Sequence, residues 1–349
     1  MTAPGGGYQA TRPSSASGRP DPSGVNQEVL MTLEHASTLA VRKPWGSTDL
    51  APWSEIAASG AAIGELWFQR SGARAPETAL LLKLLFTTET LSIQVHPDDA
   101  FARSIGLPNG KTEAWYILSA DPGAEVAIGL KRQLTAPELR GAIADGSISE
   151  LVQWHRVQKD DVVFVPAGTI HAIGPGLVIA EIQQSSDATF RLFDYGRQRE
   201  LHIDNAVAVA DARSARRQEA AKRLTNARAL LAVSPYFVLE RFELPPQSNW
   251  DLRAEHETWL LVIEGDARIG LMNAFVGEAI FLDDEHARIR AGRQGLKALV
   301  AYLATEPSHN LLHQRDGQDL PASLPHTVRQ PDPQTAMAGS RSRSTEARP

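Results

Sequence analysis

Short apolar or alternating stretches, separated by turn residues, recur through the middle of the chain. Residues 79–86 (ALLLKLLF) are apolar except for Lys83, and residues 91–96 alternate between apolar and polar positions. Similar runs follow at 113–118, 161–166, 177–182, 236–244, 258–263, 279–282 and 296–303. Runs of about four to eight residues, rich in β-branched and aromatic side chains and bounded by Gly, Pro and Asp, are typical of strands. The pattern therefore predicts a mainly β barrel or sandwich.

Two helical segments interrupt this pattern. Thr135-Ala-Pro-Glu138 combines an N-cap residue, an early proline and a glutamate three positions later, which predicts a helix that runs towards Trp154. Residues 205–232 are rich in Ala and Arg and predict a helical linker on the surface between two β regions. The arginines of the linker fit a solvated helix face better than a binding patch.

A faint internal repeat supports two related β regions. Residues 113–118 (EAWYIL) resemble residues 257–262 (ETWLLV), and residues 161–171 (DVVFVPAGTIH) are echoed by residues 278–286 (EAIFLDDEH). The second copy lacks Pro-x-Gly and is two residues shorter. We therefore expect a duplicated barrel in which only the first copy carries chemistry, and no second metal site at His256, Glu257 and His286.

Composition limits the class of protein and its partners. The chain has 349 residues, a net charge of −6 and no cysteine, and its ends (1–36 and 306–349) predict disordered tails that flank β regions at 37–204 and 233–305. The charge gives no reason to expect nucleic-acid binding, and no signal peptide or membrane span is apparent. We therefore expect a cytoplasmic protein, a monomer or homodimer, in which any metal is held by nitrogen and oxygen ligands.

Four side chains predict such a metal site. Gln94 and His96 are two apart in an alternating strand, so both leave the same face. Glu113 begins the next clear strand, and the turn Pro166-Ala-Gly-Thr-Ile-His171 returns a second histidine after an apolar strand. Each histidine alone fits an ordinary polar residue at a strand end, but together these ligands suit zinc or a similar divalent ion.

The segments around these residues resemble cupin barrels and, more narrowly, the short bacterial form of the type I mannose-6-phosphate isomerases. The turn Pro-x-Gly-x-x-His matches the second cupin motif, and Gln-Val-His-Pro-Asp is a variant of the first. The narrower resemblance rests on six segments in order between about residues 42 and 204, namely KPWG (43–46), IGELW (63–67), LSIQVHPDD (91–99), GKTEAWY (110–116), PAGTIHAIG (166–174) and EIQQSSDATFR (181–191).

The resemblance implies two jelly-roll cupin barrels with helical connections, the first of them catalytic. It also implies one zinc ion per chain bound by His96, Glu113, His171 and Gln94, and an isomerase that interconverts mannose 6-phosphate and fructose 6-phosphate through an enediol(ate). Arg191 and Lys111 match catalytic positions of the family, and Ser92 matches a position near the sugar phosphate. Lys83, Asp187 and Arg197 lie within the resembling region, and we expect them to contribute to substrate binding as well.

Physical chemistry constrains these roles. Lys111 can act as a base only if its pKa is lowered, whereas Arg191 stays protonated and suits enediolate or phosphate. The alternative for Arg191 is a salt bridge with Asp187 or Asp194. Asp160 and Phe190 depart from the family pattern, where glycine and tyrosine are usual, and bear on turn geometry. Two other functions stay open: a metal-dependent cupin enzyme of the dioxygenase type, and a non-catalytic sugar-binding cupin.

Overall fold

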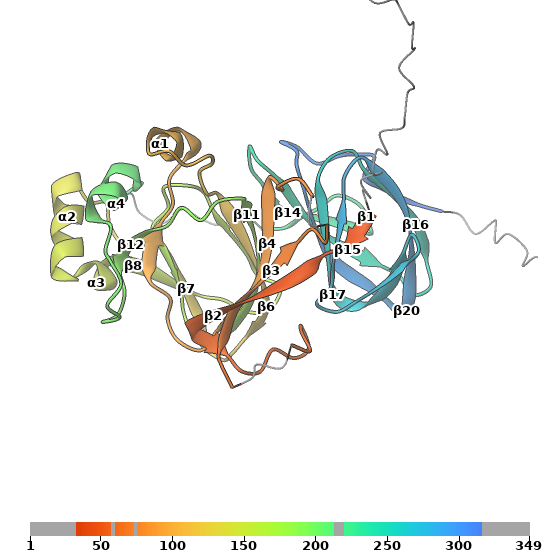
Figure 1. Ribbon diagram of the computed structural model, residues 1–349, viewed down its shortest axis with the longest axis horizontal. Coiled ribbons are helices and arrows are strands. Elements are labelled where there is room, and N and C mark those ends of the chain that lie inside the picture. The colour runs from red at the N-terminus through yellow and green to blue at the C-terminus, as the bar shows by residue number, and fades with distance from the viewer. Residues whose placement is uncertain (1–32, 57–59, 73–74, 213–219, 316–349) are drawn as a thin grey trace, which may run out of the picture.

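The computed structural model describes residues 33–56, 60–72, 75–212 and 220–315 (Figure 1). The chain is mainly β, as the sequence predicts, and every strand pair in these ranges is antiparallel. Two sheets make up the first half, and a larger sheet follows. None of the described helices has both the length and the apolar character needed to cross a membrane.

The first two sheets face each other as a sandwich. One has six strands in the order β2 (Ser37–Ser47), β3 (Ile63–Gln69), β4 (Leu80–Thr87), β11 (Leu177–Gln184), β6 (Glu113–Ala120) and β9 (Val162–Val165). The other has five, β12 (Phe190–Phe193), β5 (Ile93–Val95), β10 (His171–Ile173), β7 (Glu125–Leu130) and β8 (Val152–Arg156). Apolar side chains from both sheets, such as Trp115 and Ile128, pack in the space between them.

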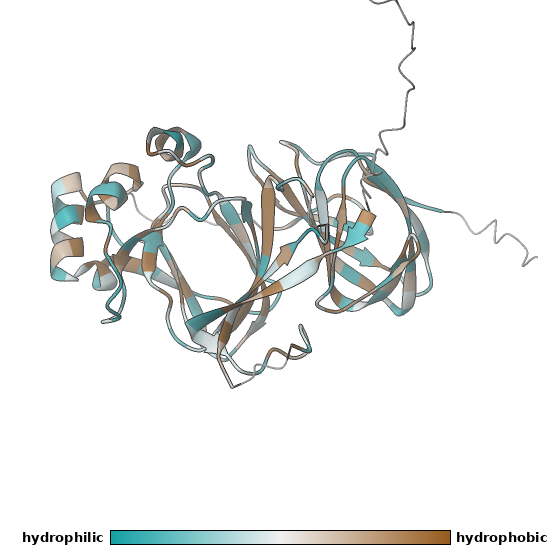
Figure 2. Ribbon diagram, viewed as in Figure 1, coloured by the Kyte–Doolittle hydropathy of each residue, from teal (hydrophilic) through white to brown (hydrophobic). Residues whose placement is uncertain are grey.

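Helices cover the other face of the five-stranded sheet. They are α2 (Ala136–Asp145), α3 (Ile148–Leu151) and α4 (Ile203–Val209), whereas α1 (Asp99–Ser104) follows β5. The predicted start of α2 is confirmed, because Thr135 Oγ1 and the Glu138 carboxylate each accept the other's backbone N–H. In Figure 2 apolar and polar positions alternate around these helices, as expected for elements with one buried face.

The third sheet has ten strands and encloses a core of its own. Its main path is β1 (Leu33–His35), β19 (Ala279–Leu282), β17 (Thr258–Ile269), β20 (Glu285–Tyr302), β15 (Val238–Leu244), β14 (Arg228–Val233) and β13 (Lys222–Arg223), joined by β16 (Asn249–Ala254), β18 (Met272–Phe275) and β21 (Leu312–Gln314). A further apolar cluster, which includes Phe68 and Trp259, joins this sheet to the outer face of the six-stranded sheet. The division into two barrels stays a prediction.

The structure differs from the predicted boundaries at three places. Strands β13 and β14 occupy residues that the sequence assigned to a helical linker, and among the described residues of that linker only those of α4 are helical. Strand β1 pairs with β19, and β21 pairs with β16, so the folded region extends into both predicted tails. At the two tails, pairing with a distant strand decided the outcome, and local composition carries no information about such a partner. In the linker, β13 and β14 form hairpins with each other and with β15 and so join the third sheet, although their composition favours a helix. The rest of both predicted tails lies outside the described residues.

A single carboxylate joins the third sheet to the start of β4. Glu257 is 8% exposed, and it accepts the backbone N–H groups of Ala79 and Leu80 at 2.7 and 2.8 Å. The indole of Trp259 donates to the same carboxylate at 3.1 Å. Glu257, which sequence analysis compared with the ligand Glu113, therefore ties two sheets together.

Replacement of Glu257 by alanine should destabilise the fold. Glu257→Ala leaves buried N–H groups without an acceptor, so we expect a loss of about 2–4 kcal/mol in the free energy of unfolding. Chemical denaturation followed by tryptophan fluorescence measures this loss. The matched control is Glu255→Ala, because Glu255 is exposed two residues away. Equal midpoints for the two variants would show that the carboxylate does not join the sheets.

Candidate metal centre and active site

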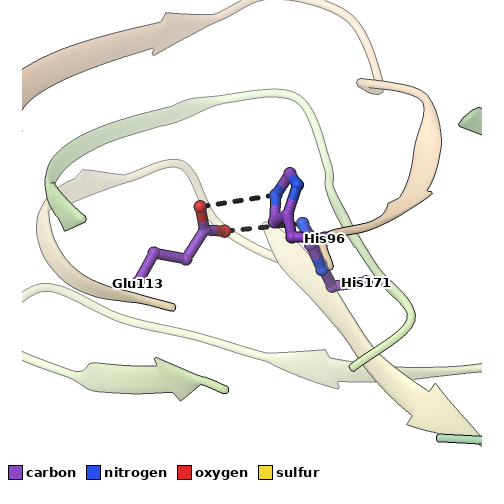
Figure 3. Close-up of side chains that lie close together, drawn as sticks. All are labelled: His96, Glu113 and His171. Carbon is purple, nitrogen blue, oxygen red and sulfur yellow. Dashed lines mark ion pairs between the residues drawn. The ribbon is translucent and has the colours of Figure 1, made fainter. Parts of the chain in front are cut away.

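Three buried side chains converge between the two sheets of the sandwich. His96 directly follows β5, Glu113 begins β6 and His171 begins β10. Each is at most 1% exposed, and their candidate ligand atoms lie within 4.8 Å of one another. Figure 3 shows the Glu113 carboxylate facing both imidazole rings, with each Nε2 at 3.4 Å from a carboxylate oxygen.

Backbone geometry brings the two histidines together. The turn before β10 contains Gly168, whose φ of 85° favours glycine, as the sequence predicts. The N–H of Gly168 donates to the carbonyl of His96 at 2.8 Å, and a Cβ atom at Gly168 would lie 3.1 Å from the Val209 carbonyl oxygen. The turn is therefore held directly against the residue that carries the first imidazole.

Hydrogen bonds to the outer ring nitrogens orient both imidazoles. His96 Nδ1 lies 2.7 Å from the Ala188 carbonyl oxygen, and His171 Nδ1 lies 2.8 Å from that of Thr169. Because a carbonyl oxygen can only accept, each Nδ1 carries the proton, and each Nε2 of a neutral ring presents a lone pair. Among the described residues, no hydrogen bond satisfies His96 Nε2 or Glu113 Oε1. This donor set fits a divalent metal ion whose histidine ligands are oriented from outside.

The electrostatics of the cluster match a ligand set. Burial, followed by the charge of Lys111, lowers the pKa of His96 to about 3, and burial also lowers the pKa of His171. Burial alone would raise the pKa of Glu113, but Lys111 and the histidines hold it well below its ordinary value. At neutral pH the cluster therefore has two neutral imidazoles and one carboxylate, which are the protonation states that metal binding needs.

A row across the five-stranded sheet places Gln94 and Arg191 beside this cluster. Register pairs Arg191 on β12 with Gln94 on β5, and Gln94 with His171 on β10, so the three side chains share one face. The Gln94 amide lies 3.2 Å from His171 Nε2, and Ser92 Oγ donates to Gln94 Oε1 at 3.3 Å. Rotating the amide by half a turn would direct its oxygen to the cluster.

Lysines and glutamates pair inside the sandwich. Lys111 Nζ lies 3.0 Å from Glu113, and Lys83 Nζ lies 3.6 Å from Glu181 and 4.0 Å from Glu65. Burial opposes the charge of Lys111, but the carboxylates of Glu113 and Glu181 outweigh it and raise its pKa. For Lys83 burial prevails, and its pKa is lowered. A lowered pKa, which sequence analysis required for Lys111 to act as a base, is therefore found at Lys83, whereas the pKa of Lys111 is raised.

Arg191 forms neither of the salt bridges considered as its alternative role. Among the described residues, no carboxylate lies within ion-pair distance of its guanidinium. Its Nη1 donates to the carbonyl of Glu200 at 2.8 Å, and its buried Nε has no partner. Asp194 instead pairs with Arg199 at 2.5 Å. Arg191 is thus a half-buried cation with unused donors on the face that carries the cluster.

The other predicted substrate residues lie in different settings. Asp187 is exposed, but its charge is close enough to act on the pKa of Lys83, which it raises against the larger lowering effect of burial. Arg197 is bound to Asp194 at 3.3 Å and to Glu89 at 3.2 Å, and it also donates to the Thr90 carbonyl. A phosphate group would have to compete with these carboxylates for Arg197.

Sequence analysis missed the acidic partners of the lysines. Glu65 and Glu181 lie within segments that carry the family resemblance, but no role was assigned to them. Glu65 and Trp67 are two residues apart on β3 and therefore share a face. Lys83 Nζ lies 4.5 Å from the centre of the Trp67 ring, and the Trp115 indole donates to Glu181 at 3.0 Å. The sequence feature that could have revealed these partners is a charged residue within an otherwise apolar strand, because a buried charge requires a partner of opposite charge.

Comparison with known proteins gives partial sequence matches. No protein-family profile matches the chain. A mannose-6-phosphate isomerase of Streptococcus mutans is 45% identical over 136 residues, which cover 37% of this chain and 43% of the relative. Mannose-6-phosphate isomerase ManA of Bacillus subtilis is 39% identical over 166 residues, which cover 44% and 51%. The chain spans about half the length of the curated relatives it matches.

Solved structures match over a longer range. A mannose 6-phosphate isomerase from Bacillus subtilis has a TM-score of 0.67 at 24% identity, and the alignment covers 78% of this chain and all of that one. A variant of phosphomannose isomerase from Salmonella typhimurium has a TM-score of 0.64 at 16% identity, with 78% and 99% covered. The chain therefore has the cupin fold of these proteins. By partial sequence identity and by fold, the chain is similar to mannose-6-phosphate isomerases, as its motifs predict.

Proposed function

We propose that this protein is a zinc-dependent aldose–ketose isomerase that interconverts mannose 6-phosphate and fructose 6-phosphate. The observation that carries the proposal is the buried cluster of His96, Glu113 and His171, with Lys111 3.0 Å from Glu113 and Arg191 on the same face of the five-stranded sheet as His171. The relatives named above support the choice of substrate.

His96, Glu113 and His171 would hold the metal, with Gln94 as a fourth ligand. Neutral imidazoles and one carboxylate suit zinc, and the chain has no cysteine to offer instead. When bound, the metal would supply Lewis-acid stabilisation of the negative oxygen that develops on the enediolate.

The reaction moves one proton between C2 and C1 of the open-chain sugar and one between the two oxygens. No atoms enter or leave, so the site needs proton carriers and no redox partner. Lys111 is the lysine that lies next to the proposed metal ligands, since its Nζ is 3.0 Å from Glu113. Burial, and then Glu113, raises the pKa of Glu181, whereas burial lowers the pKa of Lys83, so the pKa values of this second lysine–glutamate pair move towards each other, which favours proton exchange within the pair.

Charge balance makes the site suitable for an anion. Three buried or half-buried lysines (Lys43, Lys83 and Lys111) face three carboxylates (Glu65, Glu181 and Glu113), whereas Arg191 has no carboxylate partner in the described part of the chain. A divalent ion would add positive charge to this balance. Arg191 and Ser92 would then contact the enediolate or the phosphate, and Arg197 would have to leave its present partners.

Removal of one imidazole should abolish metal binding and activity together. We expect the purified protein to contain about one zinc ion per chain and to isomerise mannose 6-phosphate, and we expect chelation to abolish that activity. His171→Ala should lose both the metal and the activity, because the remaining side chains leave the ligand set incomplete. Elemental analysis and a coupled isomerase assay measure the two quantities.

A histidine outside the site provides the control for this prediction. His286→Ala removes an exposed imidazole of the third sheet and should keep both the metal and the activity. Isomerase activity that persists after complete chelation would refute the metal mechanism. Oxygen consumption by a protein loaded with iron or manganese would favour the dioxygenase type of cupin instead.

The variant Arg191→Lys should show whether the reaction needs only a positive charge at this position or also the planar guanidinium on the five-stranded sheet. The variant keeps one positive charge but loses the planar fork of donors, so we expect kcat to fall by about 100- to 1000-fold while the metal content stays unchanged. The exposed Arg156→Lys on β8 is the matched control and should retain its rate. Unchanged kinetics in Arg191→Lys would remove this residue from the proposed chemistry, and sugar phosphate binding without turnover in the native protein would favour a sugar-binding cupin.

A further inference from the structure

Arg191 is carried by a strand that has only one neighbour. Strand β12 lies at the edge of the five-stranded sheet, and its partner is β5. The outward backbone groups of an edge strand lack a ladder partner, so they must find other hydrogen bonds or face water. The position of an arginine on such a strand depends on what satisfies those groups.

One residue satisfies both outward groups of Arg191. The Arg191 N–H donates to Nδ1 of the His202 ring at 3.1 Å, and the His202 N–H donates to the Arg191 carbonyl at 2.9 Å. The two residues are thus joined like a bridge of neighbouring strands, in which the imidazole nitrogen replaces a carbonyl oxygen. The adjacent Glu200 carbonyl accepts from the guanidinium itself at 2.8 Å.

The direction of this bond fixes the protonation of the imidazole. A backbone N–H can only donate, so His202 Nδ1 must present a lone pair, and the ring must be neutral with its proton on Nε2. A protonated ring would place an N–H against the Arg191 N–H and break the bridge. His202 directly precedes α4 but makes no side-chain cap bond to that helix, so its ring serves β12 instead.

The surroundings of the ring favour the neutral form. Burial and then the charge of Arg191 lower the pKa of His202, against the opposite effect of Glu200. On α4, Asp204 is paired with Arg140 of α2 at 2.6 Å, and the ring of Phe190 makes a T-shaped contact with the His202 ring, with centroids 6.1 Å apart. None of the proposed metal ligands appears among these contacts.

We propose that His202 is a positioning residue for Arg191, whose neutral ring holds the β12 backbone so that the guanidinium stays on the face of the metal cluster. Acid then acts on the site by breaking this bridge, which lets the edge strand move away from β5. The effect on turnover rests on the proposed isomerase function, whereas the hydrogen bond itself does not.

Three variants test the proposal. His202→Asn offers an amide oxygen near the place of Nδ1 and cannot be protonated, His202→Ala removes the acceptor, and His155→Asn changes an exposed histidine on β8 as the control. Hydrogen exchange of the Arg191 amide, followed by NMR between about pH 5 and pH 8, reports the bridge without any substrate. The same proteins are assayed for kcat, KM and metal content at each pH, so that metal loss is separated from strand movement.

The proposal predicts a distinct pattern. In the native protein and in His155→Asn, protection of the Arg191 amide should fall as the pH drops below the ordinary pKa of histidine, because the lowered pKa of His202 places protonation of its ring there, whereas His202→Asn should keep the protection across the range. His202→Ala should lack protection at every pH, and its kcat should fall by up to about 100-fold while the metal is retained. His202→Asn should restore most of that rate and lose less of it in acid.

Two results would overturn the proposal. One is an Arg191 amide that is equally protected in His202→Ala, and the other is acid loss in His202→Asn that equals the native loss. If no protein of the set isomerises mannose 6-phosphate, the proposed function fails, but the exchange of the Arg191 amide still decides whether His202 holds β12.

Discussion

Charge pairing inside an otherwise apolar sandwich is the constraint on which the site depends. Glu113, Glu181 and Glu65 reach the interior from strands β6, β11 and β3 of the six-stranded sheet, and each faces a lysine. A buried carboxylate without such a partner would take up a proton or destabilise the fold. The pairs therefore allow charges to persist beside Trp115 and Ile128, in a region where water cannot replace them. The same low polarity makes any field at the centre strong.

That constraint also explains why the histidine cluster differs from the lysine pairs. Glu113 has a lysine on one side, but its Oε1 and the Nε2 atom of His96 have no hydrogen-bond partner among the described residues. Every other part of the cluster is fixed by a bond from outside, since both Nδ1 atoms donate to backbone carbonyls. Unsatisfied atoms at the centre of an oriented shell are what a bound cation would complete.

Motifs with local geometry could be predicted from the sequence, whereas partners from distant strands could not. The turn at Gly168 and the cap at Thr135 depend on neighbours within a few residues, and both are confirmed. The grouping of His96, Glu113 and His171 was predicted from strand alternation and from the turn before His171, and the family resemblance implied the same set. Strands β13 and β14 were expected to be helical, because the Ala- and Arg-rich composition favours a helix, whereas the structure builds these residues into hairpins with each other and with β15 as part of the third sheet. Similarly, sequence analysis required a lowered pKa for Lys111 to act as a base, but the sequence does not show that Glu181 lies near enough to raise that pKa.

Asp160 shows how a departure from the family pattern becomes a structural contact. Its φ of 74° suits glycine, so an aspartate there is strained. Its carboxylate accepts from the Tyr116 hydroxyl at 2.5 Å and from Lys297 of β20 at 2.9 Å. These bonds offset the strain and connect the turn before β9, the strand that begins with Glu113, and the third sheet. The third sheet therefore braces β6 at Tyr116 and β4 through Glu257, and these are the two strands that carry Glu113 and Lys83. The third sheet thus contributes to the site by fixing the strands on which the site is built.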